Sequence, residues 1–167
     1  MNILRLMKSL GFLTPRQLLE WYPPFWLMRV KVLELDDDWS TVRLRLPLTA
    51  FSRNMGDSMF GGYQAAVADP IAALACAKKF PDFDVWTRAM NIDFIAVGNT
   101  DLELRFNFDL VLENQIRNDL VSHGRSNPKF EYALYRQDGV CCSRITNTVA
   151  IRHQGYKPRN LSGNSVS

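Results

Sequence analysis

The chain has 167 residues, of which 47% are hydrophobic and 22% are charged, and its net charge is +3. This length and composition are typical of one soluble globular domain and exclude an intrinsically disordered chain. The small positive charge, without a basic run, gives no reason to expect a nucleic-acid partner. No apolar run approaches the roughly 18 residues of a membrane-spanning helix, so no membrane partner is expected.

The cysteines and histidines exclude several kinds of chemistry. Cys76, Cys141 and Cys142 are an odd number, and the adjacent pair would point to opposite faces of a strand, so we expect reduced thiols and a cytoplasmic protein. The only histidines, His123 and His153, lack metal-ligand spacing. With no phosphate loop or dinucleotide fingerprint either, the sequence predicts no metal and no other cofactor.

The first 26 residues are expected to form a helical arm. Apolar residues recur at helical spacing over 3–10 and 18–21. Proline removes a backbone donor and disfavours a helix interior, so Pro23-Pro24 should stop the second of these helices.

Alternation of apolar and polar residues predicts strands in several segments of the chain. The clearest is 101–110, where every second residue from Leu102 to Leu110 is apolar. The turn at Asp138-Gly139 predicts a hairpin. We expect strands at 27–35, 40–46, 86–97 and 101–110, a hairpin over 129–153, a short helix at 112–124 that stops at Gly124, and a polar, disordered tail at 154–167.

The segment 59–80 is rich in alanine, which favours helix. Few polar residues interrupt it between Gln64 and Lys78, so we expect a helix buried on most sides. A buried helix between groups of strands indicates an α+β architecture, with a curved antiparallel sheet around a long central helix.

This order of elements, together with NMGDSMFGGYQAAVAD (54–69) and MNIDFI (90–95), resembles the hotdog fold. The likeness is greatest to its acyl-CoA thioesterases of the phenylacetate-degradation type. It covers roughly residues 27–153, which we take as the hotdog domain. Phe-Gly-Gly followed by Asp-Pro is similar to a thioesterase-like branch of the same superfamily.

Members of that family carry an Asn, then His-Gly-Gly six positions later, then an Asp nine positions past the His. Here Asn54, Gly61, Gly62 and Asp69 keep the spacing, and Phe60 stands where the family has His. The resemblance implies hydrolysis of an acyl-CoA thioester by a homo-oligomer, a dimer or a tetramer, with composite sites at the subunit interface.

Gly61-Gly62 stands at the start of the predicted central helix. The first amides of a helix lack acceptors within it and lie at the positive end of the helix dipole. Glycine lets a ligand approach them, so a thioester carbonyl that becomes an oxyanion would be stabilised there. The alternative is structural, since glycine is common at helix starts. Asn54 and Asp69 at the family spacing favour the functional interpretation.

Asp69 lies in an apolar stretch, where a carboxylate is costly unless it has partners. Its functional interpretation is a general base or a nucleophile. The alternative is a helix N-cap, because Asp followed by Pro70 is typical of a cap with proline at the first helical position. Gly61 and Asp69 are also about 12 Å apart along a straight helix, so one carbonyl cannot contact both in one chain. The site should therefore combine two copies, and a monomer should be inactive.

Asn54 could orient the attacking water or the carbonyl, or simply make a local turn. In relatives a hydroxyl at the position of Thr87 supports the catalytic carboxylate, although Thr is also a common strand residue. Asn91 and Asp93 could line a groove or face solvent. The residues expected to bind the substrate are Met59, Phe60, Gly62, Tyr63 and Asn91.

The sequence therefore predicts an acyl-CoA thioesterase that acts on a small-molecule substrate. Asp69, Asn54, Gly61 and Thr87 are its candidate catalytic residues. Two alternatives remain open, a non-catalytic acyl-CoA or fatty-acyl binding module and a structural dimer without a ligand.

Overall fold

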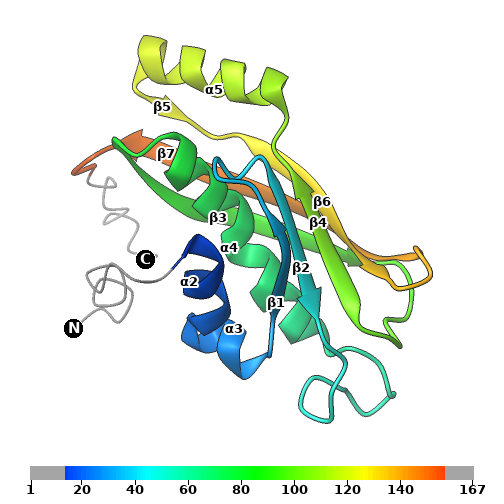
Figure 1. The fold of residues 1–167 in the computed structure, drawn as a ribbon. Helices are drawn as coiled ribbons and strands as arrows, with labels where there is room; N and C mark the ends of the chain where they lie inside the picture. Colours follow the sequence, from blue (N-terminus) through cyan, green and yellow to red (C-terminus); the bar gives the residue numbers. More distant parts are fainter. Residues whose placement is uncertain (1–13, 157–167) are drawn as a thin grey trace, which may run out of the picture.

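The computed structural model describes residues 14–156, and within them the chain folds as one antiparallel sheet around a long helix (Figure 1). The helices are α2 (Pro15–Trp21), α3 (Pro23–Leu27), α4 (Gly61–Lys79) and α5 (Leu110–His123). The strands are β1 (Lys31–Leu35), β2 (Thr41–Leu46), β3 (Phe83–Phe94), β4 (Leu102–Asn107), β5 (Arg125–Ser126), β6 (Lys129–Arg136) and β7 (Cys141–His153).

The strand order is β1-β2-β4-β6-β7-β3, and the short β5 pairs with β7. All these pairs are antiparallel. The sheet bends around α4, which contacts strands from both of its halves (Figure 1). The expected α+β architecture with a central helix is confirmed, and the Asp138-Gly139 turn joins β6 to β7 as predicted.

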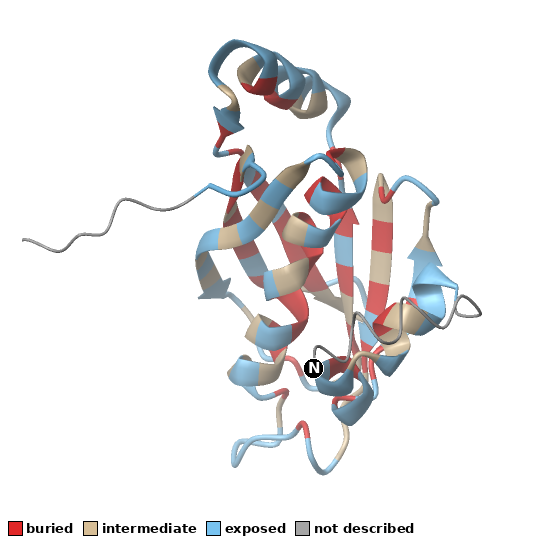
Figure 2. Cartoon of the chain, turned by 90° about the vertical axis from the view of Figure 1, so that its left-hand side faces the viewer, coloured by how far each residue is buried: buried red, intermediate tan, exposed pale blue. Residues whose placement is uncertain are grey.

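The central helix buries one face. Figure 2 shows the buried residues between α4 and the strands, while α5 at the top of the view is largely exposed. The expectation that the 59–80 helix is buried on most sides is wrong for the single chain, because Ala66, Asp69, Leu74 and Ala77 are exposed. The buried side chains of α4 are mostly small: Gln64, Val67, Ala68, Ile71, Ala72, Ala75 and Cys76.

Of two predicted boundaries at the N-terminal side, one is confirmed and one is wrong. α2 ends at Trp21, just before Pro23-Pro24 as predicted, and the same prolines then begin α3, where proline fits because the first helical amides have no acceptor anyway. The strand expected from residue 27 starts at Lys31, since 23–27 are helical and Arg29 adopts a φ of 57° that interrupts an extended run.

Another boundary is wrong at the end of the 101–110 strand. β4 ends at Asn107 because Asp109 caps α5, with its Oδ1 accepting from the Val111 amide at 2.8 Å. Leu110, the last residue of the predicted alternation, begins α5 instead and is 71% exposed. The other end of α5 agrees with the prediction, since Gly124 takes a φ of 65° after its last turn.

Among the described residues, no helix is both long enough and apolar enough to cross a membrane. All three cysteines are unpaired. The helical spacing predicted over 3–10 and most of the tail predicted at 154–167 lie outside the described residues.

The C-terminal end of α4 is fixed by a lysine that is almost covered. The Lys79 side chain is 6% exposed, and its Nζ lies 2.9 Å from both an Asp38 carboxylate oxygen and a Glu113 carboxylate oxygen. Burial opposes the ionisation of Glu113, but hydrogen bonds from Lys79 and Arg117 more than offset it and hold the pKa of that carboxyl below its ordinary value. This cluster joins α4, the β1–β2 turn and α5.

Lys79→Met should lower the free energy of unfolding at pH 7 by about 2 to 3 kcal/mol, somewhat less than the loss for a fully buried pair. Because the pKa of Glu113 is lowered in the folded state, the stabilisation is present above the unfolded carboxyl pKa of about 4.3 and is lost as the pH falls through the folded value. The difference between wild type and variant should therefore shrink in acid.

Urea denaturation of both proteins at several pH values measures this difference. Lys78→Met is the matched control, because Lys78 is the exposed neighbour in the same helix turn. An equal loss in both variants, or a loss that does not change with pH, would remove the ion-pair explanation.

Candidate functional site

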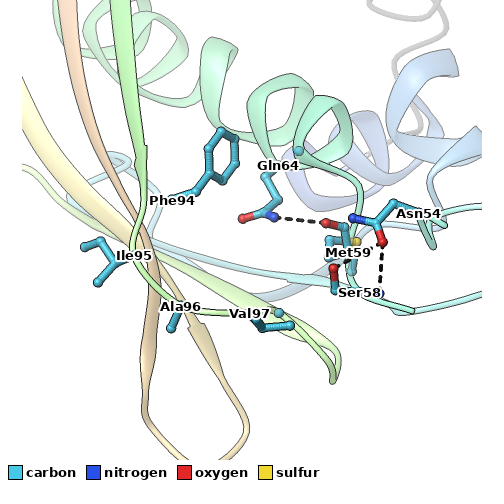
Figure 3. Close-up of a pocket in the computed structure, with 10 residues that line it drawn as sticks. Asn54, Ser58, Met59, Gln64, Phe94, Ile95, Ala96 and Val97 are labelled. Atoms are coloured by element: carbon cyan, nitrogen blue, oxygen red, sulfur yellow. Dashed lines mark hydrogen bonds between the residues drawn. The ribbon is translucent and has the colours of Figure 1, made fainter. Parts of the chain in front are cut away.

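A pocket of about 420 Å³ opens where α4 begins (Figure 3). One wall is the loop that leads into α4, and the other is the segment in which the chain leaves β3. The residues that line the pocket are Asn54, Ser58, Met59, Gly61, Gln64, Phe94, Ile95, Ala96, Val97 and Gly98. Three of the residues predicted for the site, Asn54, Met59 and Gly61, therefore do meet in one cavity.

The start of α4 brings one backbone amide that lacks a helical acceptor to the pocket lining, that of Gly61. Its N-cap, Phe60, makes no side-chain capping bond. The amides of Gly61 and Gly62 have no acceptor within the helix, and the first amide to bond back is that of Tyr63, to the Phe60 carbonyl at 3.0 Å. A Cβ on Gly61 would lie 2.9 Å from Cζ of Phe94, so glycine leaves room for the Phe94 ring at this point.

Asn54 makes a tight turn within the loop. Its Oδ1 accepts hydrogen bonds from the Ser58 amide at 3.1 Å and the Ser58 hydroxyl at 3.2 Å (Figure 3). The same Oδ1 also accepts from the Gly56 amide at 2.9 Å. The local-turn interpretation is therefore correct for the oxygen. Because Asn54 also lines the pocket, its Nδ2 amide group is the part that can donate to a ligand.

Gln64 is a pocket residue that the sequence prediction missed. It is 4% exposed, and its Nε2 donates to the Met59 carbonyl at 3.2 Å (Figure 3). Its Oε1 accepts from the Ser143 hydroxyl at 2.5 Å. These bonds tie the loop, α4 and β7 together at the pocket wall. A glutamine in an otherwise apolar helix face was the available signal, since a buried amide needs fixed partners.

Four of the five predicted substrate-binding residues, Phe60, Gly62, Tyr63 and Asn91, lie outside the pocket lining. The ring of Phe60 folds over Gly62, where it would collide with any added Cβ, and packs edge-on against Tyr63 with ring centroids 6.1 Å apart. Phe60 is 51% exposed. The residue in the family's His position therefore packs on the first turn of α4 rather than facing this cavity.

Asp69 lies two turns further along α4 and is also outside the pocket lining. It is exposed and inside the helix, which continues through Pro70 to Lys79, so the N-cap interpretation is wrong. Thr87, from β3, donates its hydroxyl to the backbone carbonyl of Asp69 at 3.0 Å in the same chain. These two candidates are therefore neighbours, at a distance along the helix from Gly61.

Asn91 is exposed on β3, where its Nδ2 donates to Oδ1 of Asp93 at 3.3 Å, and it does not line the pocket. The described residues contain no group of three or more histidine, cysteine, aspartate or glutamate side chains that could hold a metal ion.

The pocket can bind a polarised carbonyl but holds no base of its own. Its polar groups are the first backbone amide of α4, the side-chain amides of Asn54 and Gln64, and the hydroxyl of Ser58, and none of its ten lining residues is acidic, basic or a histidine. The helix dipole favours negative charge at this end of α4. Asp69, the candidate base predicted from the sequence, lies elsewhere on the surface of α4.

Comparison with known proteins places the chain in a family. The model of the family described as Domain of unknown function (DUF4442) matches residues 14–151, which is most of the chain, so the chain belongs to that family. No curated protein matches it.

Solved structures share the fold at low sequence identity. A Pseudomonas aeruginosa protein described as a probable thioesterase is 19% identical with a TM-score of 0.73, over 83% of this chain and 93% of that one. A Chlorobaculum tepidum protein is 14% identical with a TM-score of 0.68, over 90% and 94%. A Haemophilus influenzae thioesterase is 12% identical with a TM-score of 0.67, over 86% and 94%. The hotdog fold expected from the sequence is thereby confirmed.

Proposed function

We propose that this member of the DUF4442 family is an acyl-CoA thioesterase with two composite sites, each built from two copies of the chain. The observation that carries the proposal is that the carbonyl donors and the candidate base lie at different places on one chain. The pocket at the start of α4 has donors for a carbonyl and no base, and the candidate base Asp69 is exposed further along the same helix.

The edge of the sheet supports a second copy beside the site. β3 is the last strand in the sheet order, and among the described strands it pairs with β7 alone, so one side of its twelve residues is open. A long open edge is a template for pairing with another chain. Asp69 lies next to this edge, since its carbonyl bonds Thr87 of β3.

Exposed apolar side chains around this edge also support association. Trp86 is 40% exposed, Phe94 59%, Ile95 53% and Val97 61%. Exposed apolar side chains that lie together often mark a protein–protein contact, and the last three of these four lie together at the wall of the pocket. A partner seated on the edge would therefore close the pocket and provide apolar surface for an acyl chain.

The residues then have distinct roles. The Gly61 amide donates to the thioester oxygen and stabilises the oxyanion, and the Nδ2 of Asn54 positions the substrate. Asp69 of the partner subunit takes a proton from water while the water oxygen bonds to the carbonyl carbon, and the thiolate of CoA leaves. Direct attack by the same carboxylate is the other route open to it.

Mixing two inactive variants tests the composite site. Asp69→Asn and Gly61→Val should each be inactive alone. When the two are co-expressed, about half of the dimers are mixed and each has one intact site out of two, so about a quarter of wild-type thiol release should return. The substrates are acyl-CoA esters of several chain lengths, and the mass in solution distinguishes dimer from tetramer.

Failure of the mixture to regain activity, with both single variants folded and dimeric, would show that each site lies within one chain. A wild-type protein that releases no thiol from any ester would remove the thioesterase assignment itself.

A non-catalytic acyl-CoA binding module is the second candidate. The observation that favours it is Phe60, which packs over Gly62 and stands where the phenylacetate-type thioesterases that the sequence resembles carry His. This module would bind acyl-CoA, as measured by calorimetry, and would show no thiol release above the rate without protein.

A further inference from the structure

The middle of α4 contains a proline that the helix must accommodate. Pro70 has no amide hydrogen, so the carbonyl of Ala66, one turn earlier, loses its usual donor. A residue that precedes proline is also disfavoured in the helical conformation, and here that residue is Asp69. The helix is therefore weakest at the residue that the proposed reaction uses as its base.

Three side chains from the sheet donate hydrogen bonds to backbone carbonyls of the helix at this point. The Tyr132 hydroxyl of β6 donates to the Ala68 carbonyl at 2.8 Å, and Nδ2 of Asn147 on β7 donates to the Asp69 carbonyl at 3.0 Å. Thr87 of β3 donates to the same Asp69 carbonyl at 3.0 Å. Side-chain donors on the carbonyls of a helix interior are unusual, because those carbonyls normally accept from the helix itself.

The two donors from β6 and β7 form one buried unit. Nδ2 of Asn147 also donates to the Tyr132 hydroxyl oxygen at 3.0 Å. Tyr132 is 5% exposed and Asn147 fully buried. Among the described residues, Oδ1 of Asn147 has no hydrogen-bond partner. A buried asparagine with an unpaired oxygen is costly, so its donating amide is the part that explains its presence.

We propose that Asn147 and Tyr132 are positioning residues, which hold the carbonyls of Ala68 and Asp69 so that the Asp69 carboxylate points to the partner's pocket. This inference rests on the proposed function. The two carbonyls are fixed by side chains of the sheet, while the side chain of Asp69 remains exposed. A displacement of about 1 Å in such a group can cost about 100-fold in rate.

The protonation state of the Tyr132 hydroxyl agrees with its role as a hydrogen-bond donor. Burial raises the pKa of its hydroxyl, the hydrogen bond from Asn147 opposes this, and the negative charge of Asp69 raises it further. The hydroxyl therefore stays protonated at neutral pH and can donate to the Ala68 carbonyl throughout the working range.

Kinetics of Asn147→Ala and Tyr132→Phe test the proposal, well below the melting temperature of each variant. We expect kcat for acyl-CoA hydrolysis to fall at least about tenfold in each, with KM changed less than about twofold, because the carbonyl-binding pocket is untouched. The double variant should lose little more than the worse single one, since both side chains act as one unit. Ile145→Val, on the same face of β7, is the control for a simple loss of packing and should keep its kcat.

Hydrogen exchange of residues 65–74 supplies a readout independent of turnover. Exchange there should be faster in both variants and unchanged in Ile145→Val. Unchanged exchange would show that the two side chains do not hold the helix. Faster exchange with an unaltered kcat would show that they stabilise the fold without positioning Asp69, and either result overturns the proposal. A wild type that hydrolyses no ester would instead refute the proposed function. The exchange comparison would still decide whether Asn147 and Tyr132 hold the helix.

Discussion

Replacing Asp69 with asparagine should lower kcat for acyl-CoA hydrolysis by about 10² to 10⁴, the usual loss when a general base is removed. The amide has nearly the shape of the carboxylate but cannot accept a proton from water. Asp69 is exposed, and the contacts that hold it to the sheet use its backbone carbonyl, which the substitution keeps. Folding and acyl-CoA affinity should therefore change little.

Thiol release and calorimetric binding of the same ester measure the two quantities separately. Asp82→Asn is the matched control, because Asp82 is an exposed carboxylate in the turn after α4. Equal turnover by wild type and Asp69→Asn would take Asp69 out of the mechanism. Binding without turnover by the wild type would favour the binding module.

The sequence predicted the central elements of the fold because their patterns are long. Alanine content marks α4 over nineteen residues, and strict alternation marks β4. The errors occur where one local contact outweighs a pattern. The apolar alternation continues to Leu110, but the cap formed by Asp109 begins α5 there. Pro23-Pro24 follow the end of α2, as predicted, but the pattern did not reveal that they also begin α3, whose Phe25 is buried in the core.

In the candidate site, too, some residues could be placed from local sequence spacing and others only from the tertiary structure. Asn54, Met59 and Gly61 are close in sequence, so their spacing was enough to place them together. Phe94 and Val97 reach the pocket because β3 ends beside the start of α4, which no local pattern reveals. Nothing in the sequence connects Asn147 with Asp69 either, since they are 78 positions apart and meet only through the register of the sheet.

Gly61→Val should lower kcat/KM for acyl-CoA hydrolysis by about 10² to 10³, the usual effect of losing one oxyanion donor. The φ of Gly61 is one that other residues adopt, so the backbone is not strained by a side chain. A Cβ here lies 2.9 Å from the end of the Phe94 ring, which is 59% exposed and can move. The branched side chain would then occupy the space through which a carbonyl reaches the amide.

Comparing the activity and the stability of two Gly61 variants distinguishes a blocked amide from a damaged helix. Gly61→Ala adds one carbon and should lose less activity than Gly61→Val, while thermal unfolding should stay close to that of the wild type for both. Ala77→Val adds similar bulk at an exposed position near the end of α4 and should keep full activity. If Gly61→Val keeps wild-type kcat/KM, a carbonyl cannot be bound at the start of α4, because no substrate oxygen could approach that amide past the added methyl groups.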